Sequence, residues 1–102
     1  MRMWNVDVSK MCKNHLLGEH LEMHMFVGSI NKGTSMDGYL EKGLLEIHNL
    51  KNRHKELVTE MLNRGYVHKS PLPALHKIIK NGIVDIEKNK KNLHDRCKEC
   101  KF

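Results

Sequence analysis

The sequence has few aromatic residues, only two prolines and no long apolar stretch. Aromatic side chains make up 5% of its 102 residues, so part of the core must come from the seven methionines, which adapt to irregular packing. No apolar run approaches the about 18 residues that a membrane-spanning helix needs, and the start, MRMWNVDVSKMC, lacks the pattern of a signal peptide. We therefore expect a small cytoplasmic protein with a modest core and no membrane partner.

Acidic residues and cysteines are also scarce. Twelve acidic side chains stand against eighteen basic ones, which gives a net charge of +6 with the histidines neutral. In so short a chain this excess favours a polyanionic partner, most simply nucleic acid, although a merely soluble basic protein is the alternative. Three cysteines in a chain without a secretion signal indicate a reducing compartment, with thiols that are free or metal-bound.

The spacing of apolar residues predicts two long helices that pack together. The first is expected over residues 7–31, where Asp7 or Ser9 could cap its start, and the second over 45–64, ending at Gly65. Because no convincing strand pattern occurs, we expect an all-α fold forming one compact, monomeric domain.

The connecting segments are predicted from their glycines and prolines. We expect a mobile, glycine-rich loop at 31–43 and a turn at 66–73, where each proline restricts the residue before it. Two shorter helices are expected at 74–81 and 83–97, so that the single domain spans residues 1–102.

Two glutamates interrupt the apolar face of the first expected helix, in the stretch HLLGEHLEMH. On a helical wheel, His15, Glu19 and Glu22 fall within about 60° of one another. Glu19 lies near the middle of the apolar arc, and a buried carboxylate is costly without a basic partner, for which Arg2 and His54 are candidates. Glu22 lies at the rim of the arc, where a role in a functional cleft is the better interpretation.

The histidines of this helix have simpler explanations than catalysis. His15 fits a hydrogen-bonded core histidine that assists Glu19. His20 and His24 lie one turn apart on the helix flank, where they could hold a metal, contact DNA or face solvent. The flank position favours exposure to solvent over metal binding.

A second group of possible metal ligands lies near the C-terminus. His94, Cys97 and Cys100 form an H-x2-C-x2-C pattern that offers three ligands suited to zinc. A structural zinc usually takes four ligands, and only Cys12 or a further histidine could complete the set. Free thiols on a frayed tail are the simpler interpretation, so no metal site is assigned.

Three stretches of the chain resemble the pyrimidine-dimer DNA glycosylase (endonuclease V) family. They are MRxW at the start, HLLGEH-x-E-x-H in the first helix, and RHKELVTEMLNRGYVHKSPL at 53–72. The resemblance covers residues 1–73, while 74–102 match far less clearly. It implies a compact all-α DNA repair enzyme that cuts the N-glycosidic bond of a UV-damaged pyrimidine and then breaks the strand by β-elimination. Its partner would be damaged double-stranded DNA, in a prokaryotic or virus-infected cell.

The resemblance also implies roles for particular residues. The family nucleophile is the α-amine of the chain's own N-terminus, which forms an imine with the deoxyribose, and the gap-free register places Met1 there. Arg2 is too large for the usual removal of the initiator methionine, so Met1 should be retained. The essential acid/base falls on Glu22, and the histidine and second glutamate of the motif fall on His15 and Glu19. No metal or redox cofactor is required.

An α-amine suits this task because it is a weaker base than a lysine side chain, so more of it is neutral and nucleophilic near neutral pH. Members of the family usually carry an arginine where Leu21 stands here, and the phage member has a further arginine where Met25 stands. Their absence puts the preference for pyrimidine dimers in question more than the lyase chemistry. Contacts with phosphates should make DNA binding depend strongly on salt concentration. The basic residues expected to contact phosphates are Arg2, Lys32, Lys42, Arg64 and Lys69.

Two other functions remain open on the sequence alone. One is a non-catalytic DNA-binding protein on the same scaffold, which would bind DNA without cutting it. The other is a metal-binding regulatory protein that uses the histidines and the C-terminal cysteines.

Overall fold

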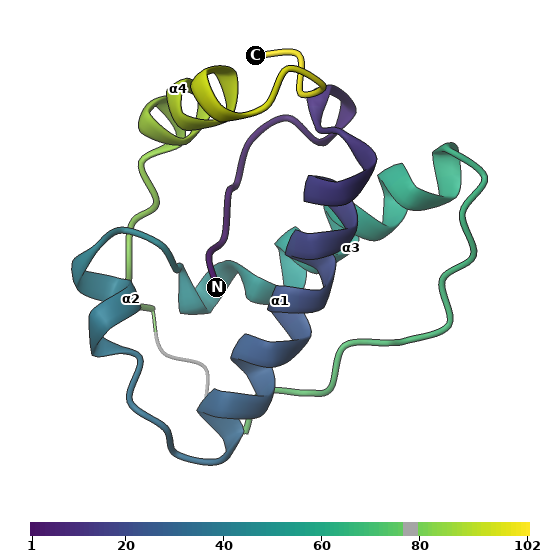
Figure 1. Ribbon diagram of the computed structural model, residues 1–102. Coiled ribbons are helices and arrows are strands. Elements are labelled where there is room, and N and C mark those ends of the chain that lie inside the picture. Colours follow the sequence, from purple (N-terminus) through teal and green to yellow (C-terminus); the bar gives the residue numbers. More distant parts are fainter. Residues whose placement is uncertain (77–79) are drawn as a thin grey trace.

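A computed structural model of the chain describes residues 1–76 and 80–102, and in this part of the chain every regular element is a helix. The all-α prediction is confirmed, with four α-helices gathered in one globule (Figure 1). Within the described residues, no helix combines the length and the apolar character that crossing a membrane requires. In chain order the elements are η1 (Val8–Lys10), α1 (Lys13–Asn31), α2 (Asp37–Glu41), η2 (Ile47–Asn49), α3 (Leu50–Asn63) and α4 (Ile86–Arg96).

The first long helix begins later than predicted, because the chain is capped twice. The Asp7 carboxylate accepts a hydrogen bond from the Ser9 N–H and so caps the short 3₁₀ turn η1. Met11 and Cys12 are then extended, and the Cys12 sulfur accepts from the His15 N–H at the start of α1. The expected single helix over 7–31 is therefore a 3₁₀ turn, a two-residue break and α1.

α1 and α3 cross and form the main helix–helix contact of the fold. The second predicted helix is shorter than 45–64, since it starts with η2 and becomes α-helical only at Leu50. The buried residues of both helices recur every three or four positions, as a single buried face requires. They are Leu16, Glu19, Met23, Phe26 and Val27 on α1, and Leu50, Arg53, His54, Leu57 and Met61 on α3.

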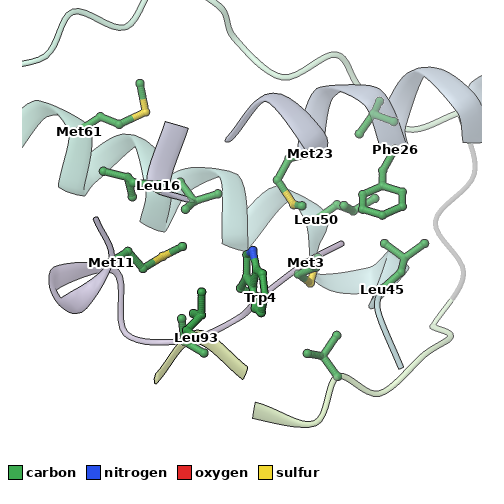
Figure 2. Packing of buried hydrophobic residues seen from close by; sticks show 14 of the residues in the cluster. Met3, Trp4, Met11, Leu16, Met23, Phe26, Leu45, Leu50, Met61 and Leu93 are labelled. Atoms are coloured by element: carbon green, nitrogen blue, oxygen red, sulfur yellow. The ribbon is translucent and has the colours of Figure 1, made fainter. Parts of the chain in front are cut away.

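The first six residues run as an extended segment through the middle of the globule (Figure 1). Met3 is fully buried and Trp4 and Val6 nearly so, and Figure 2 shows Met3 and Trp4 among core side chains that include Leu45 and Leu93. Fully burying one such apolar side chain stabilises a fold by about 1.5–3 kcal/mol. The N-terminal segment is therefore part of the core, and its position is fixed by packing.

The region 31–43 contains more structure than the expected loop. The short helix α2 occupies its second half, and Gly43, with φ +68°, follows at the turn after this helix. Leu44 N–H donates to the Tyr39 carbonyl at 2.9 Å, which ties the end of the region back onto α2. The prediction of a mobile loop without regular structure was therefore wrong for its second half.

A helix was predicted at 74–81. Residues 74–76 and 80–81 are not helical, and residues 77–79 lie outside the described part of the chain. The Asn31 side chain explains why, since its amide accepts from the His76 N–H at 2.9 Å and donates to the Ala74 carbonyl at 3.0 Å. The Ala74 carbonyl is one that a helix starting at 74 would use for its own ladder.

The last predicted helix, 83–97, begins only at Ile86. The Val84 N–H donates to the Glu46 carboxylate at 2.8 Å, which keeps this stretch extended, and Asp85 caps α4 by accepting from the Lys88 N–H at 3.0 Å. Gly82 has a φ of +97°, and a Cβ there would lie 2.0 Å from the Leu45 carbonyl oxygen. Only glycine allows this close approach of the two backbones.

Candidate active site

The N-terminal segment brings the start of the chain to Glu22. The Arg2 backbone N–H donates a hydrogen bond to Glu22 Oε2 at 3.0 Å, and the next residue, Met3, donates its N–H to the Leu44 carbonyl at 2.7 Å. Only the Met1 Cα and carbonyl carbon separate the Met1 α-amine from the Arg2 nitrogen. Standard backbone dimensions therefore keep the amine within about 7 Å of the Glu22 oxygen. Met1 and Glu22 are both half-buried, so neither residue is sealed from solvent.

The Arg2 side chain fixes the same segment from its other side. Its guanidinium lies over the Trp4 ring, 3.8 Å from the ring centroid, and donates to Asn89 Oδ1 on α4. Asn89 is buried and its amide also donates to the Trp4 carbonyl at 2.7 Å. Burial lowers the pKa of Arg2, as does the charge of Arg96, whereas Glu22 raises it. Arg2 is thus held in tertiary contacts beside the Glu22 carboxylate.

Glu19 has a buried partner, which is Arg53 rather than the expected Arg2 or His54. The guanidinium donates to both carboxylate oxygens, at 2.5 Å and 2.8 Å, and also to the Val6 carbonyl at 2.8 Å. Both residues are about 1% exposed, so this pair lies inside the α1–α3 contact and out of reach of a ligand. Burial raises the pKa of the Glu19 carboxyl, and the hydrogen bonds and charge of Arg53 oppose that rise.

His15 lies with the cysteines and not with the Met1 amine. Its Nδ1 is 3.1 Å from the Cys12 sulfur and 3.5 Å from the Cys100 sulfur, and its ring packs edge-on against Trp4. Together with Cys97, these residues form a group that we call the Cys3His cluster: Cys12, His15, Cys97 and Cys100.

His94, which the sequence pattern grouped with Cys97 and Cys100, is not a member of this cluster. Its Nδ1 lies 2.6 Å from the Phe102 carbonyl oxygen. The thiols of Cys12 and Cys100 are buried and that of Cys97 is partly exposed, and burial raises the pKa of Cys100 to about 12.

His20 and His24 face two further histidines across the helix crossing. The resulting histidine cluster consists of His20, His24, His54 and His68, whose ring nitrogens lie within 4.8 Å of one another. Burial lowers the pKa of His20 to about 4, and the neighbouring imidazoles act in the same direction. Burial also lowers the pKa of His24 and of His54. Histidine is the commonest metal ligand in proteins, so the convergence of four imidazole rings makes this group a candidate metal site.

The predicted phosphate contacts divide into two kinds. Lys32, Lys42 and Lys69 are exposed, and in the described part of the chain none of them forms an ion pair. Arg64 is instead committed to the fold, because it pairs with Glu60 and donates to two carbonyls before α1, those of Val8 and Met11. Its hydrogen bond to Glu60 raises the pKa of Arg64.

A cavity of about 680 Å³ lies between α3 and the segment 71–75, and neither Met1 nor Glu22 lines it. Its walls include His54 and His68, so it opens beside the histidine cluster. The amine–carboxylate pair therefore lies apart from this cavity, at a point where Glu22 is half-exposed.

These features define a small, basic, all-α protein that holds its own N-terminus beside a carboxylate. Residues 1–74 match the family model described as pyrimidine dimer DNA glycosylase, and the chain belongs to this family. The resemblance seen in the sequence is thereby confirmed, and the membership indicates DNA repair and binding to damaged DNA. No curated protein and no solved structure matched the chain.

Several residues at these sites were not expected from the sequence. The matching spacings of Cys12-x2-His15 and Cys97-x2-Cys100 were the one available signal for the Cys3His cluster. Because 81 residues lie between His15 and Cys97, no local pattern joins the two halves. Nothing in the sequence indicated that Arg53 and Asn89 are buried, because a polar residue on a helix is ordinarily exposed.

Proposed function

We propose that this protein is a DNA glycosylase with apurinic/apyrimidinic lyase activity, acting on UV-damaged or abasic double-stranded DNA as a monomer. The Met1 α-amine is the nucleophile and Glu22 the acid/base. One observation carries the proposal: in a chain of this family, the Arg2 N–H donates to Glu22 and so holds the neighbouring amine beside the carboxylate.

The amine would begin the reaction at the sugar. Its lone pair attacks C1′ of the deoxyribose, the bond from C1′ to the base breaks, and the base leaves with the electron pair and a proton. The nitrogen supplies both protons that the products need. One goes to the departing base, and the other goes to O4′ as the sugar ring opens, which gives the imine. Glu22 supports this step because its negative charge stabilises the positively charged iminium form.

The strand would break by β-elimination from the imine. Glu22 takes the proton from C2′, the C3′–O bond breaks, and the 3′ phosphate leaves with the bonding electrons. Water then hydrolyses the imine and frees Met1 for another turn. To bring C1′ to the amine, the damaged nucleotide must leave the helical stack.

The other residues of the motif would act by positioning. Arg2 orients the N-terminal segment through Trp4 and Asn89, and its backbone N–H donates to the Glu22 carboxylate. Glu19 locks α1 onto α3 through Arg53, which fixes the helix that carries Glu22.

Contact with DNA would come from the net charge of +6 and from the exposed lysines. Lys32, Lys42 and Lys69 remain the candidates for phosphate contacts. Leu21 and Met25, at 59% and 47% exposed, flank Glu22 on the surface of α1. An apolar pair at this point would grip the duplex less strongly than charged residues do, which favours abasic DNA over intact dimers as substrate.

Borohydride trapping tests the nucleophile directly. The full chain with an untagged N-terminus is incubated with duplexes that carry an abasic site or a pyrimidine dimer, and borohydride reduces any imine to a stable amine. We expect a covalent protein–DNA adduct that peptide mapping assigns to Met1. An adduct on a lysine, or none, would reject the proposal, and DNA binding without any strand scission would favour a non-catalytic DNA-binding protein.

Substitution of Glu22 tests the acid/base. Glu22→Gln should slow strand cleavage by about 10²–10⁴-fold, the usual contribution of a positioned acid or base, while DNA binding persists. Glu41→Gln is the matched control, since Glu41 is an exposed glutamate on α2. Equal cleavage by the two variants would remove Glu22 from the mechanism.

A further inference from the structure

The Cys3His cluster joins the start of α1 to the tail that follows α4. Cys12 is the N-cap of α1 and His15 lies in its first turn, whereas Cys97 ends α4 and Cys100 lies three residues further on. The four ligand atoms all lie within 4.8 Å of one another. A backbone hydrogen bond from the Lys101 N–H to the Lys10 carbonyl, at 2.8 Å, fixes the two segments side by side.

The distances within the cluster fit a tetrahedral zinc site. Zinc bonds of about 2.3 Å to sulfur and about 2.0–2.1 Å to nitrogen place two sulfur ligands about 3.8 Å apart, and a sulfur and a nitrogen about 3.6 Å apart. The Cys97 and Cys12 sulfurs are 3.8 Å apart, and the Cys100 sulfur is 3.5 Å from His15 Nδ1. The Cys12 sulfur is closer to His15 Nδ1, at 3.1 Å.

Two backbone N–H groups are also directed at sulfur atoms of the cluster. The Cys12 N–H donates to the Cys100 sulfur at 3.2 Å, and the His15 N–H donates to the Cys12 sulfur at 3.5 Å. Both donors belong to the start of α1, so these sulfurs lie at the N-terminus of that helix. The 3.8 Å between Cys97 and Cys12 is far from the about 2.05 Å of a disulfide bond.

We propose that Cys12, His15, Cys97 and Cys100 bind one structural zinc ion. Three cysteines and one histidine supply all four positions of a tetrahedron, which leaves no open position for catalysis. On binding, the three thiols release their protons to solvent and no electron is transferred. The site is separate from Met1 and Glu22, and it does not depend on the proposed enzymatic function.

The zinc would fasten the C-terminal part of the chain to the start of α1, which packs against the N-terminal segment. Cys97 and Cys100 lie beyond residues 1–74, which match the family, so the tail would bring two of the ligands to the matched part. His15 packs against Trp4, and Trp4 carries the guanidinium of Arg2. A metal at this point closes a long loop of chain and stabilises the folded state by its binding free energy.

Metal analysis and cobalt substitution test the zinc site on the untagged full chain. Both the unsubstituted protein and the Cys97→Ser variant are purified under reducing conditions. The variant should contain one equivalent of zinc per chain less than the unsubstituted protein. His94→Gln, a matched control outside the cluster, should keep that equivalent. Replacing zinc with Co²⁺ should produce the near-ultraviolet thiolate-to-cobalt absorption of a tetrahedral site.

The cobalt spectrum of the unsubstituted protein needs no variant, so the test stands even if Cys97→Ser fails to fold. A reduced, folded protein that binds Co²⁺ without thiolate absorption would overturn the proposal. So would a disulfide between any two of the three cysteines under the same reducing conditions.

The histidine cluster carries a second inference from separate observations. His24 Nε2 and His54 Nε2 lie 3.2 Å apart, while the Nε2 atoms of His20 and His68 are buried and have no hydrogen-bond partner among the described residues. Buried polar atoms are ordinarily paired, so two unpaired imidazole nitrogens that converge with two others require an explanation. The geometry points to a divalent transition-metal site with four imidazole ligands, the ligand type that suits zinc, copper and nickel.

Metal titration distinguishes this site from the Cys3His cluster. The untagged protein should bind two equivalents of Co²⁺, of which only one shows thiolate absorption. His68→Gln should bind one equivalent and keep the thiolate absorption, whereas the control His48→Gln, at an exposed position, should bind two. A protein that binds one equivalent before and after the His68 substitution would overturn the assignment.

Discussion

Arg53 on α3 donates to both carboxylate oxygens of Glu19 on α1, and neither residue is more than about 1% exposed. This ion pair lies within the main helix–helix contact, where apolar side chains would be expected. It explains why a carboxylate can lie near the middle of the apolar face of α1. It also separates the two glutamates of the motif, since Glu19 is sealed in the core and Glu22 is accessible.

Breaking this pair should destabilise the fold strongly. Removing one partner of a buried ion pair leaves the other charge without compensation, so Glu19→Gln and Arg53→Met should each lower the free energy of unfolding by about 3–5 kcal/mol. The double variant should recover much of that loss. Urea unfolding of the two single variants and the double variant measures the coupling, and additive losses would show that the residues are not energetically coupled.

Asn89→Ala should loosen the N-terminal segment. Asn89 holds the Arg2 guanidinium and the Trp4 carbonyl, so its removal leaves buried groups unpaired at a cost of about 1–3 kcal/mol. If Met1 and Glu22 act as proposed, the rate of borohydride trapping at saturating DNA should fall as well. Asn92→Ala on the same helix is the control and should affect neither quantity. Unchanged trapping with reduced stability would show that Asn89 supports the fold alone.

Gly82→Ala should destabilise the protein through backbone strain. The φ of +97° and a Cβ at 2.0 Å from the Leu45 oxygen force either Gly82 or Leu45 to move, which costs about 1–3 kcal/mol. Gly18→Ala is an instructive control, because Gly18 lies inside α1 with nothing within 4 Å of its Cβ position. That substitution should stabilise the helix by about 0.5–1 kcal/mol. Thermal unfolding should therefore show a lower Tm for Gly82→Ala and a higher Tm for Gly18→Ala than for the unsubstituted protein.

The basic residues should separate into DNA contacts and structural groups. Lys32→Ala, Lys42→Ala or Lys69→Ala should each reduce the slope of log affinity against log salt by about 1 if that lysine contacts a phosphate. Arg64→Ala should instead lower the free energy of unfolding and leave the slope unchanged, because its donors serve Val8, Met11 and Glu60. Fluorescence anisotropy over a range of salt concentrations gives the slopes. A reduced slope for Arg64→Ala alone would reverse the assignment.

The elements that the sequence predicted well are those fixed by local periodicity. The two long helices and the all-α class follow from apolar residues at helical spacing, and tertiary contacts changed only their ends. The ends differed because single side chains acted on the backbone. The Cys12 sulfur restarted α1, Asn31 held residues 74–76 out of a helix, and Glu46 kept Val84 extended.

For the candidate site, the sequence indicated the residue types and a register but not their partners. Glu22 and Met1 were identified through the family resemblance, and their proximity became visible only through the Arg2 hydrogen bond. His94 was grouped with the wrong neighbours, because spacing along the chain was the only criterion. Cys12 and His15 lie far from Cys97 in sequence, and folding alone brings them together.

The sequence by itself determined the helical class, the positive charge and the unusual carboxylates on the first helix, because each of these is a local or summed property of the residues. The tertiary structure alone decided that Glu19 pairs with Arg53, that the chain start lies beside Glu22, and that two groups of histidine and cysteine side chains converge. Such contacts join residues that are distant along the chain, and they depend on the angle at which α1 crosses α3 and on the path of the N-terminal segment through the core. No local pattern encodes either of these.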